Sequence, residues 1–278
     1  MVNILTAIEN LVNKPLLKIG ASYLGRNRIH NIGEGLEEYI KDLFAGSIDD
    51  EKETRLAKIN ETFSYIGNKN NPPDLILKNG DAIEIKKIES MGSSLALNSS
   101  YPKARLYADS PLITTACRTC ENWTEKDMWY VVGVVDKSNV LKALCFVCGE
   151  DYAASNEIYE RIKQSIREGV VNIPDVEFSE TNELGRVNKV DPLGITYLRI
   201  RGMWGIQNPF CVFREIYTLS AKAMFHFMAI MNEKKYEEMG GISYEKLNIK
   251  DVKIKNPDNP AQLKKAKLIT FCVEGEEE

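Results

Sequence analysis

The chain has 278 residues, of which 44% are hydrophobic and 27% charged, with a net charge of −4. These fractions are close to those of average globular proteins, so the chain can bury a sizeable core, and a largely disordered chain is excluded. No apolar run reaches the roughly 18 residues that span a bilayer, because even residues 223–231 are interrupted by His226.

Hydrophobic periodicity and turn residues predict the secondary structure in chain order. The first half is predicted to hold helices over 3–13 and 32–45, a loop over 67–73, and strands over 74–77 and 81–88 joined at Asn79-Gly80. The second half is predicted to hold a hairpin of strands over 129–136 and 140–147, a helix over 156–168, a strand over 195–201 and a long helix over 214–238. This order predicts a mixed α/β domain with a central sheet.

Charge is distributed unevenly along the chain. Acidic residues gather in 49–53 and 274–278, whereas the segment 186–203 has a net charge of +3. That segment contains four basic residues and one acidic residue: Arg186, Lys189, Arg199, Arg201 and Asp191. Such asymmetry permits a focused binding groove on an acidic body.

Three charged residues come together in the first predicted hairpin. In its second strand, Glu84 and Lys86 lie on one face, while Ile83 and Ile85 point to the other. A carboxylate and an ammonium on one face of a core strand are costly unless they are solvated, paired or metal-bound. With Asp74 at the start of the preceding strand, the pattern favours a magnesium site. The alternative is an edge hairpin with a solvated charged face.

Asp74 and Glu84 can share a metal ion only if they lie on the same face of the hairpin. With a strict two-residue turn at Asn79-Gly80, Asp74 would oppose Ile85 and point away from Glu84. A three-residue connection with a bulge, or a bend of the chain at Asp74, would bring the two carboxylates to one face. A clean two-residue turn would therefore contradict the metal site.

The spacing of Asp74 with Glu84-Ile85-Lys86 resembles the signature of the PD-(D/E)XK nucleases, in which the Asp and Glu hold magnesium and the Lys assists the attacking water. Longer blocks resemble the NgoPII-like type II restriction endonucleases. In chain order these blocks are LEEYIKDLF (36–44), NPPD (71–74), NGDAIEIKKIES (79–90), LALNSSYPKARL (95–106), VVGVVDK (131–137) and ITYLRIRGMWGIQNP (195–209). The resemblance covers roughly residues 1–215. Residues 216–278 are expected to form a helical C-terminal extension of unknown role within a single domain of 1–278.

The resemblance implies a PD-(D/E)XK core, with a central mixed β-sheet flanked by helices, and a Mg²⁺-dependent enzyme that cuts both strands of double-stranded DNA. It implies the palindrome GGCC as the site, a homodimer in which each subunit reads one half-site, and a cognate DNA methyltransferase as functional partner. Two alternatives remain open from the residues: a repair or junction-resolving nuclease of the same fold, and a non-catalytic DNA-binding or zinc-binding module.

Glu37 is a further catalytic candidate. It lies at the border of the apolar stripe of the predicted helix over 32–45, where the superfamily pattern often adds a glutamate to the metal site. The pattern favours Glu37 over Glu38, and an ordinary surface glutamate is the alternative.

The strand over 195–201 carries the candidates for reading DNA bases. Tyr197, Arg199 and Arg201 share one face and Leu198 and Ile200 the other, as in a sheet covered on one side. The two arginines could each bind a guanine of a GG half-site through O6 and N7, or could instead grip phosphates. The other DNA-binding candidates are Arg186, Asn98, Ser99, Ser100 and Lys103.

Two Cys-x-x-Cys pairs, Cys117 with Cys120 and Cys145 with Cys148, would suit tetrahedral zinc. However, Cys145 and Cys148 lie in a strand-like run, where residues three apart face opposite sides, so buried hydrophobic cysteines are favoured. Six cysteines and a first segment without the features of a signal peptide indicate a cytoplasmic, reduced protein. With only His30 and His226, sites built from several histidines are excluded.

Overall fold

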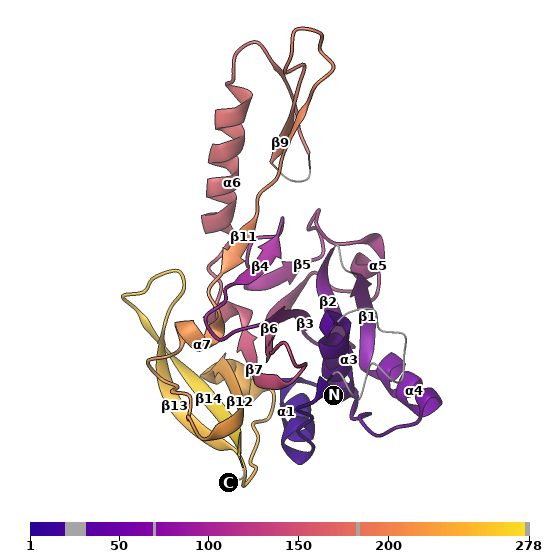
Figure 1. Ribbon diagram of the computed structural model, residues 1–278, viewed down its shortest axis with the longest axis vertical. Coiled ribbons are helices and arrows are strands. Elements are labelled where there is room, and N and C mark those ends of the chain that lie inside the picture. The colour runs from indigo at the N-terminus through magenta and orange to yellow at the C-terminus, as the bar shows by residue number, and fades with distance from the viewer. Residues whose placement is uncertain (20–31, 69–70, 182–183, 276–278) are drawn as a thin grey trace.

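A computed structural model describes residues 1–19, 32–68, 71–181 and 184–275 (Figure 1). Its centre is a mixed β-sheet to which nine strands within these ranges contribute. The order along the sheet is β1 (Phe63–Asn68), β2 (Asn71–Leu77), β3 (Ala82–Ile88), β6 (Glu125–Val135), β7 (Leu141–Cys148), β12 (Ala223–Asn232), β14 (Leu263–Glu274) and β13 (Asn248–Lys255), and β5 (Arg105–Tyr107) pairs with β6. β3 is parallel to β6 and β7 is parallel to β12, while the other neighbours are antiparallel. The predicted mixed α/β class with a central sheet is confirmed.

The middle strands are buried on both faces because their side chains alternate between two cores. In β6, Trp129 and Val131 pack into a first core, whereas Tyr130 and Val132 pack into a second. The first core is covered by helices and the second mainly by short elements. The covering elements are α1 (Ile4–Asn13), α3 (Ile32–Ala45) and α4 (Lys52–Thr62) on the first side, and α5 (Thr115–Arg118), α7 (Pro209–Val212) and the two-stranded sheet of β4 (Leu95–Asn98) with β11 (Trp204–Ile206) on the second.

Most elements predicted before residue 148 are confirmed. The helices over 3–13 and 32–45 correspond to α1 and α3, whose apolar residues recur with the helical period. The predicted hairpins correspond to β2–β3 and β6–β7. The loop predicted over 67–73 is wrong in part, since Asn71, Pro72 and Pro73 belong to β2. The two prolines are accommodated because they stand at the beginning of the strand, before the residues that pair with β3.

The long helix predicted over 214–238, and with it the helical nature of residues 216–278, is wrong. The segment forms β12 followed by the short helix α8 (Glu233–Glu238), and the chain continues through β13 and β14. β12 lies between β7 and β14, so both of its faces are buried: Phe225 and Phe227 enter the first core and Met228 the second. Such a continuous apolar run has no alternation, and periodicity cannot distinguish it from a buried helix.

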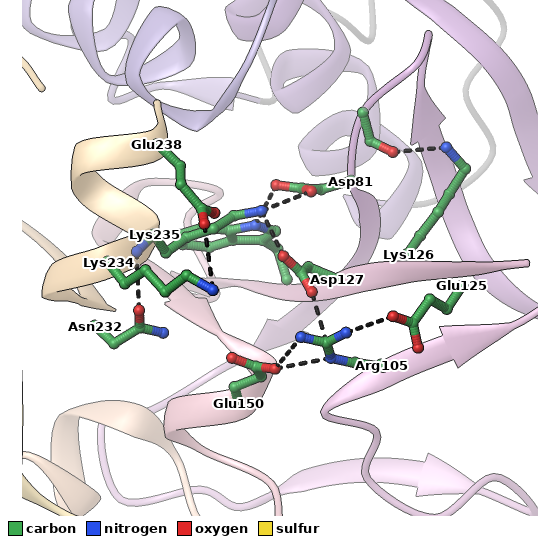
Figure 2. A network of polar contacts seen from close by, with 12 residues as sticks. Asp81, Arg105, Glu125, Lys126, Asp127, Glu150, Asn232, Lys234, Lys235 and Glu238 are labelled. Atoms are coloured by element: carbon green, nitrogen blue, oxygen red, sulfur yellow. Dashed lines mark hydrogen bonds and ion pairs between the residues drawn. The ribbon is translucent and has the colours of Figure 1, made fainter. Parts of the chain in front are cut away.

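The C-terminal segment fixes the position of the first hairpin through a network of ion pairs (Figure 2). The Lys235 Nζ of α8 lies 2.8 Å from Asp81, just before β3, and 2.6 Å from Asp127 in β6. Trp129 Nε1 donates to the other oxygen of Asp81 at 2.8 Å. Because β3 begins at this network, residues far along the chain help to hold the strand that carries Glu84.

An arm projects from the body between β7 and β12 (Figure 1). We define the arm as the described residues within 156–203, that is 156–181 and 184–203, which contain α6 (Asn156–Val171) and a three-stranded sheet of β8 (Glu177–Ser179), β9 (Gly185–Asn188) and β10 (Leu198–Ile200). The helix predicted over 156–168 is confirmed. The strand predicted over 195–201 is shorter than expected and pairs with β9 instead of the central sheet. None of the described helices is long and apolar enough to cross a membrane.

Candidate active site

The register of the first hairpin brings Asp74 and Glu84 to one face. Leu75 pairs with Ile83 and Ile76 with Ala82, so the same register sets Asp74 opposite Glu84. The Leu77 N–H donates to Asp81 O at 3.0 Å, which leaves three residues, 78–80, as the connection. Of the two turn lengths considered, the three-residue connection is therefore the one that forms, and the strict two-residue turn is wrong.

The three charged side chains form a compact group. Lys86 Nζ donates to Glu84 Oε1 at 2.6 Å, and the backbone N–H of Ile85 donates to Asp74 Oδ2 at 2.6 Å. The second oxygen of Glu84, Oε2, is buried and has no hydrogen-bond donor. A buried carboxylate oxygen without a donor is costly, and a hard cation is the kind of ligand that would satisfy it.

The protonation states of the group follow from burial and from its mutual charges. Burial raises the pKa of Asp74 well above its ordinary value of 3.8, and the charge of Glu84 raises it further, while Lys86 and the N–H of Ile85 lower it. Burial lowers the pKa of Lys86, but the charges of Glu84 and Asp74 outweigh burial and raise that pKa above its ordinary value. Lys86 therefore keeps its proton at neutral pH.

A cavity of about 560 Å³ lies over this group and extends to the base of the arm. We call it the groove. It is lined by Asn68, Asn71, Pro72, Asp74, Glu84, Lys86, Leu97, Asn98, Ser99, Ser100, Pro111, Leu112, Arg199, Arg201 and Met203. Residues from the hairpin, the end of β4 and the arm thus meet around one space, although they are far apart in the sequence.

Arg199 and Arg201 line the groove, whereas Arg186 does not. Arg186 stands opposite Arg199 in the pair β9–β10, and its guanidinium carbon lies 3.7 Å from the ring centroid of Tyr197. The expected cover over the other face of this strand is wrong, because Leu198 is 56% exposed. Val187, its partner on the middle strand β9, is only 4% exposed, so this face is covered at β9 but not at the edge strand β10.

Lys103 lies beneath the groove and is only 5% exposed. Its Nζ donates to Ser100 Oγ and, at 3.2 Å, to the carbonyl of Tyr101, and it lies 4.6 Å from the ring centroid of Tyr101. A small cavity lined by Lys103 and Glu84 adjoins the groove. Lys103 is thus placed to hold the segment that presents Ser99 and Ser100 to the groove.

Replacing Lys103 by Met is expected to remove a pH dependence of stability. Burial lowers the pKa of Lys103 from its ordinary 10.5 to about 8. Between these values the unfolded chain binds more protons than the folded one, so this group makes the free energy of unfolding increase as pH rises through that window. Urea unfolding below, within and above the window measures it, with Lys137→Met in an exposed turn as control. The same pH slope in Lys103→Met and wild type would contradict the prediction.

Glu37 is half-buried on α3 and does not line the groove. Its charge nevertheless contributes to raising the pKa values of Asp74 and Lys86, so it lies near the group. Glu38 instead forms ion pairs with Arg55, whose Nη2 lies 2.6 Å from it, and with Lys41.

The comparisons with known proteins agree in one assignment. The NgoPII restriction endonuclease family model matches residues 2–259. The chain is also 52% identical over 275 residues to the type II restriction enzyme NgoPII of Neisseria gonorrhoeae, across 97% of this chain and 99% of that protein. The chain belongs to the NgoPII restriction endonuclease family. It is a type II restriction endonuclease, and the family likeness continues beyond residue 215, where the sequence blocks ended. No solved structure matches the chain.

The cysteines of this restriction enzyme do not form the zinc site considered from the sequence. Cys145 packs into the second core and Cys148 into the first, so the two thiols lie on opposite faces of β7. Over the part of the chain that the structure describes, no group of three or more His, Cys, Asp or Glu side chains is arranged to hold a metal ion. The groove accordingly offers two carboxylates, and Mg²⁺ commonly takes one or two and fills its other positions with water and phosphate oxygens.

Sequence reasoning missed seven residues that line the groove in this family member, which are Asn68, Asn71, Pro72, Leu97, Pro111, Leu112 and Met203. The two asparagines stand just before the Pro-Pro-Asp run, and we interpreted them only as loop formers. Their position within three to six residues of Asp74 was the available signal. Met203 gives no comparable signal in the sequence.

Proposed function

We propose that this restriction enzyme hydrolyses both strands of double-stranded DNA at the palindrome GGCC, with Mg²⁺ as cofactor. The observation that carries the proposal is the groove, in which Asp74, Glu84 and Lys86 lie together with Arg199 and Arg201. Two carboxylates suit a hard cation, and arginines suit phosphates and guanines. The PD-(D/E)XK core is part of the proposal, supported by Asp74 on β2 facing Glu-x-Lys on β3 in a sheet covered by helices.

The proposed roles follow from the protonation states and contacts. Asp74 and Glu84 would hold Mg²⁺, with the unsatisfied Oε2 of Glu84 as one ligand atom. The chemistry that bound Mg²⁺ supplies is activation of water and neutralisation of charge on the phosphate. Because Lys86 keeps its proton, it would assist by donating a hydrogen bond and a positive charge to the attacking oxygen and the transition state, instead of acting as a base. Glu37 would add its negative charge to the cation site.

The partners that we propose are a second subunit and a methyltransferase. A palindrome presents the same half-site twice, so a two-fold homodimer can place one groove at each strand. A cognate DNA methyltransferase would protect the same sequence in the cell. At the end of β4 and just beyond it, Asn98, Ser99 and Ser100 are proposed to contact DNA in the groove. The buried Lys103 is proposed to act on DNA binding through Ser100, and Arg186 to contact DNA from the arm, outside the groove.

Digestion of a plasmid with several GGCC sites, with and without Mg²⁺, tests the proposal. The expected result is a discrete set of fragments only with Mg²⁺, and sequenced ends that all fall within GGCC. Fragments with ends at another sequence would refute the site, and smears or nicks at branched DNA would favour a repair nuclease. Intact DNA that is retarded in a gel would refute hydrolysis under the proposed conditions.

Arg199→Ala and Arg201→Ala are expected to weaken binding to GGCC DNA by about 1–3 kcal/mol each, and binding to scrambled DNA much less. Each guanidinium on the groove wall can form two hydrogen bonds with one guanine. Binding titrations on both DNAs across a salt series measure this, with Lys189→Ala as a control in the arm outside the groove. Equal losses on both DNAs, with a salt slope lower by about one, would assign these arginines to phosphates.

A further inference from the structure

Exposed apolar side chains are concentrated on the arm. Of nineteen large hydrophobic side chains that are exposed in the described chain, eleven belong to residues 156–203. They are Ile158, Ile162, Ile166, Val171, Ile173, Val190, Leu193, Ile195, Tyr197, Leu198 and Met203. Exposed apolar side chains that gather on one part of a protein mark it as a candidate interaction site.

One side of α6 is already packed. Tyr159 stacks on Tyr101 with 5.3 Å between ring centroids, and it meets Trp204 edge-on at 5.7 Å. Further along the helix, Arg167 donates to the carbonyls of Thr181 and Leu184 at 2.7 and 3.3 Å. These contacts attach the helix to the body and to the rest of the arm.

Next to its packed side, α6 carries an isoleucine stripe, which we define as Ile158, Ile162 and Ile166. These residues are four positions apart and therefore lie on one side of the helix. They are 36%, 44% and 43% exposed, and α6 contains no buried residue. A helix of this length is only marginally stable unless an apolar face is packed, and the contacts of α6 within one chain leave this stripe in solvent.

We propose that the isoleucine stripe binds the isoleucine stripe of a second copy of this chain, with the two α6 helices antiparallel about a two-fold axis. The inference rests on the homodimer of the proposed function and names the surface that forms it. In an antiparallel pair, one step forward along one helix corresponds to one step back along its partner. The residue numbers of every opposed pair therefore add up to the same sum. If Ile162 opposes the partner's Ile166, the sum is 328, so two of the three isoleucines in each stripe oppose isoleucines of the partner and Ile158 opposes Val170.

Charges beside the stripe support an antiparallel self-association. Arg161 and Glu168 lie on the same flank of the stripe, because seven residues are close to two helical turns. Their numbers sum to 329, so Arg161 comes within one residue's rise, about 1.5 Å, of opposing the partner's Glu168. The two-fold axis repeats the contact, which gives two ion pairs. In a parallel pair, Arg161 would instead lie level with the partner's Arg161, and Glu168 with the partner's Glu168.

The positions of these two charges are compatible with the contact. Glu168 Oε1 accepts a hydrogen bond from Gln164 Nε2 at 3.0 Å, which holds the carboxylate on this flank. Both side chains are exposed. Because the arm carries Arg199 and Arg201, joining two arms would fix the two grooves relative to each other.

Charge exchange in the full chain tests the proposal. Sedimentation velocity over a concentration series gives the dimer dissociation constant of wild type, Arg161→Glu, Glu168→Arg and the double variant. Each single change replaces two attractions by two repulsions and is expected to raise the constant about tenfold or more. The double variant is expected to return to within about threefold of wild type. A double variant that stays as weak as the single ones would overturn the antiparallel arrangement.

Ile162→Ser tests the apolar part, with Leu56→Ser as a matched control because Leu56 on α4 is 46% exposed. Ile162→Ser is expected to raise the dissociation constant and Leu56→Ser to leave it unchanged, while thermal unfolding shows that both variants fold. A dimer that is unchanged in every α6 variant would overturn the isoleucine stripe as its interface, although the proposed homodimer would survive. A wild-type chain that remains monomeric with and without DNA would overturn both proposals, and normal plasmid digestion would still leave the nuclease assignment intact.

Discussion

Lys86→Ala is expected to slow DNA cleavage by about 10²–10⁴-fold while leaving DNA affinity close to that of wild type, which is the range for loss of a group that assists the reacting atoms. The ammonium lies 2.6 Å from Glu84 and lines the groove, so its removal takes away a donor and a positive charge at the proposed position of the attacking oxygen. Single-turnover cleavage of a short duplex measures the rate, and a gel shift without Mg²⁺ measures the affinity.

Lys87→Ala is the matched control for this experiment. Lys87 is the next residue of β3, so its side chain points to the opposite face, and it does not line the groove. We expect its cleavage rate to stay near that of wild type. Normal cleavage by Lys86→Ala would remove Lys86 from the catalytic group, whereas a loss of affinity equal to the loss of rate would make it a DNA-binding residue.

Asp74→Asn is expected to abolish Mg²⁺-dependent cleavage without destabilising the metal-free protein at neutral pH. Burial and the charge of Glu84 raise the pKa of Asp74 well above 3.8, so the folded state binds this proton more tightly than the unfolded state. The contribution of Asp74 to stability is therefore present at acidic pH and is lost as pH rises through the folded pKa. Asparagine has no charge to bury and escapes this loss.

Thermal unfolding with and without Mg²⁺ over a pH series measures the effect. In wild type, Mg²⁺ must displace the Asp74 proton, so its stabilising effect is expected to grow as pH rises. In Asp74→Asn the effect is expected to disappear, whereas Asp109→Asn, which changes an exposed aspartate, should behave as wild type. An unchanged Mg²⁺ effect in Asp74→Asn would refute Asp74 as a ligand.

Local patterns in the sequence were sufficient for elements that have one buried face. α1 and α3 show the helical period because each covers a single core, and β3 alternates because Glu84 and Lys86 face the groove while Ile83 and Ile85 are buried. β12 was mistaken for a helix because its neighbours on both sides bury it completely. The burial of β12 depends on β14, which follows more than thirty residues later in the chain. The local sequence of β12 therefore carries no signal of this neighbour.

Most polar residues that line the groove were predictable from the sequence, but their geometry was not. Alternation alone places Glu84 beside Lys86, but the position of Asp74 depends on the length of the turn, and Asn79-Gly80 is compatible with two lengths. The structure has Asn79 at a φ of 55° within a three-residue connection. The approach of Arg199 and Arg201 to the hairpin depends on the arm, whose direction relative to the body no local pattern encodes.

The place of the arm in the chain bears on how sequence preference can change during evolution. The arm is inserted between β7 and β12, yet these two strands pair directly in parallel, so the sheet is complete without it. Asp74, Glu84 and Lys86 belong to the sheet, whereas Arg199 and Arg201 belong to the insertion. Under the proposed function, mutations in the arm can therefore alter which DNA is bound while the proposed hydrolytic residues keep their positions, and an exchange of this one segment between relatives is a direct route to enzymes with new target sequences.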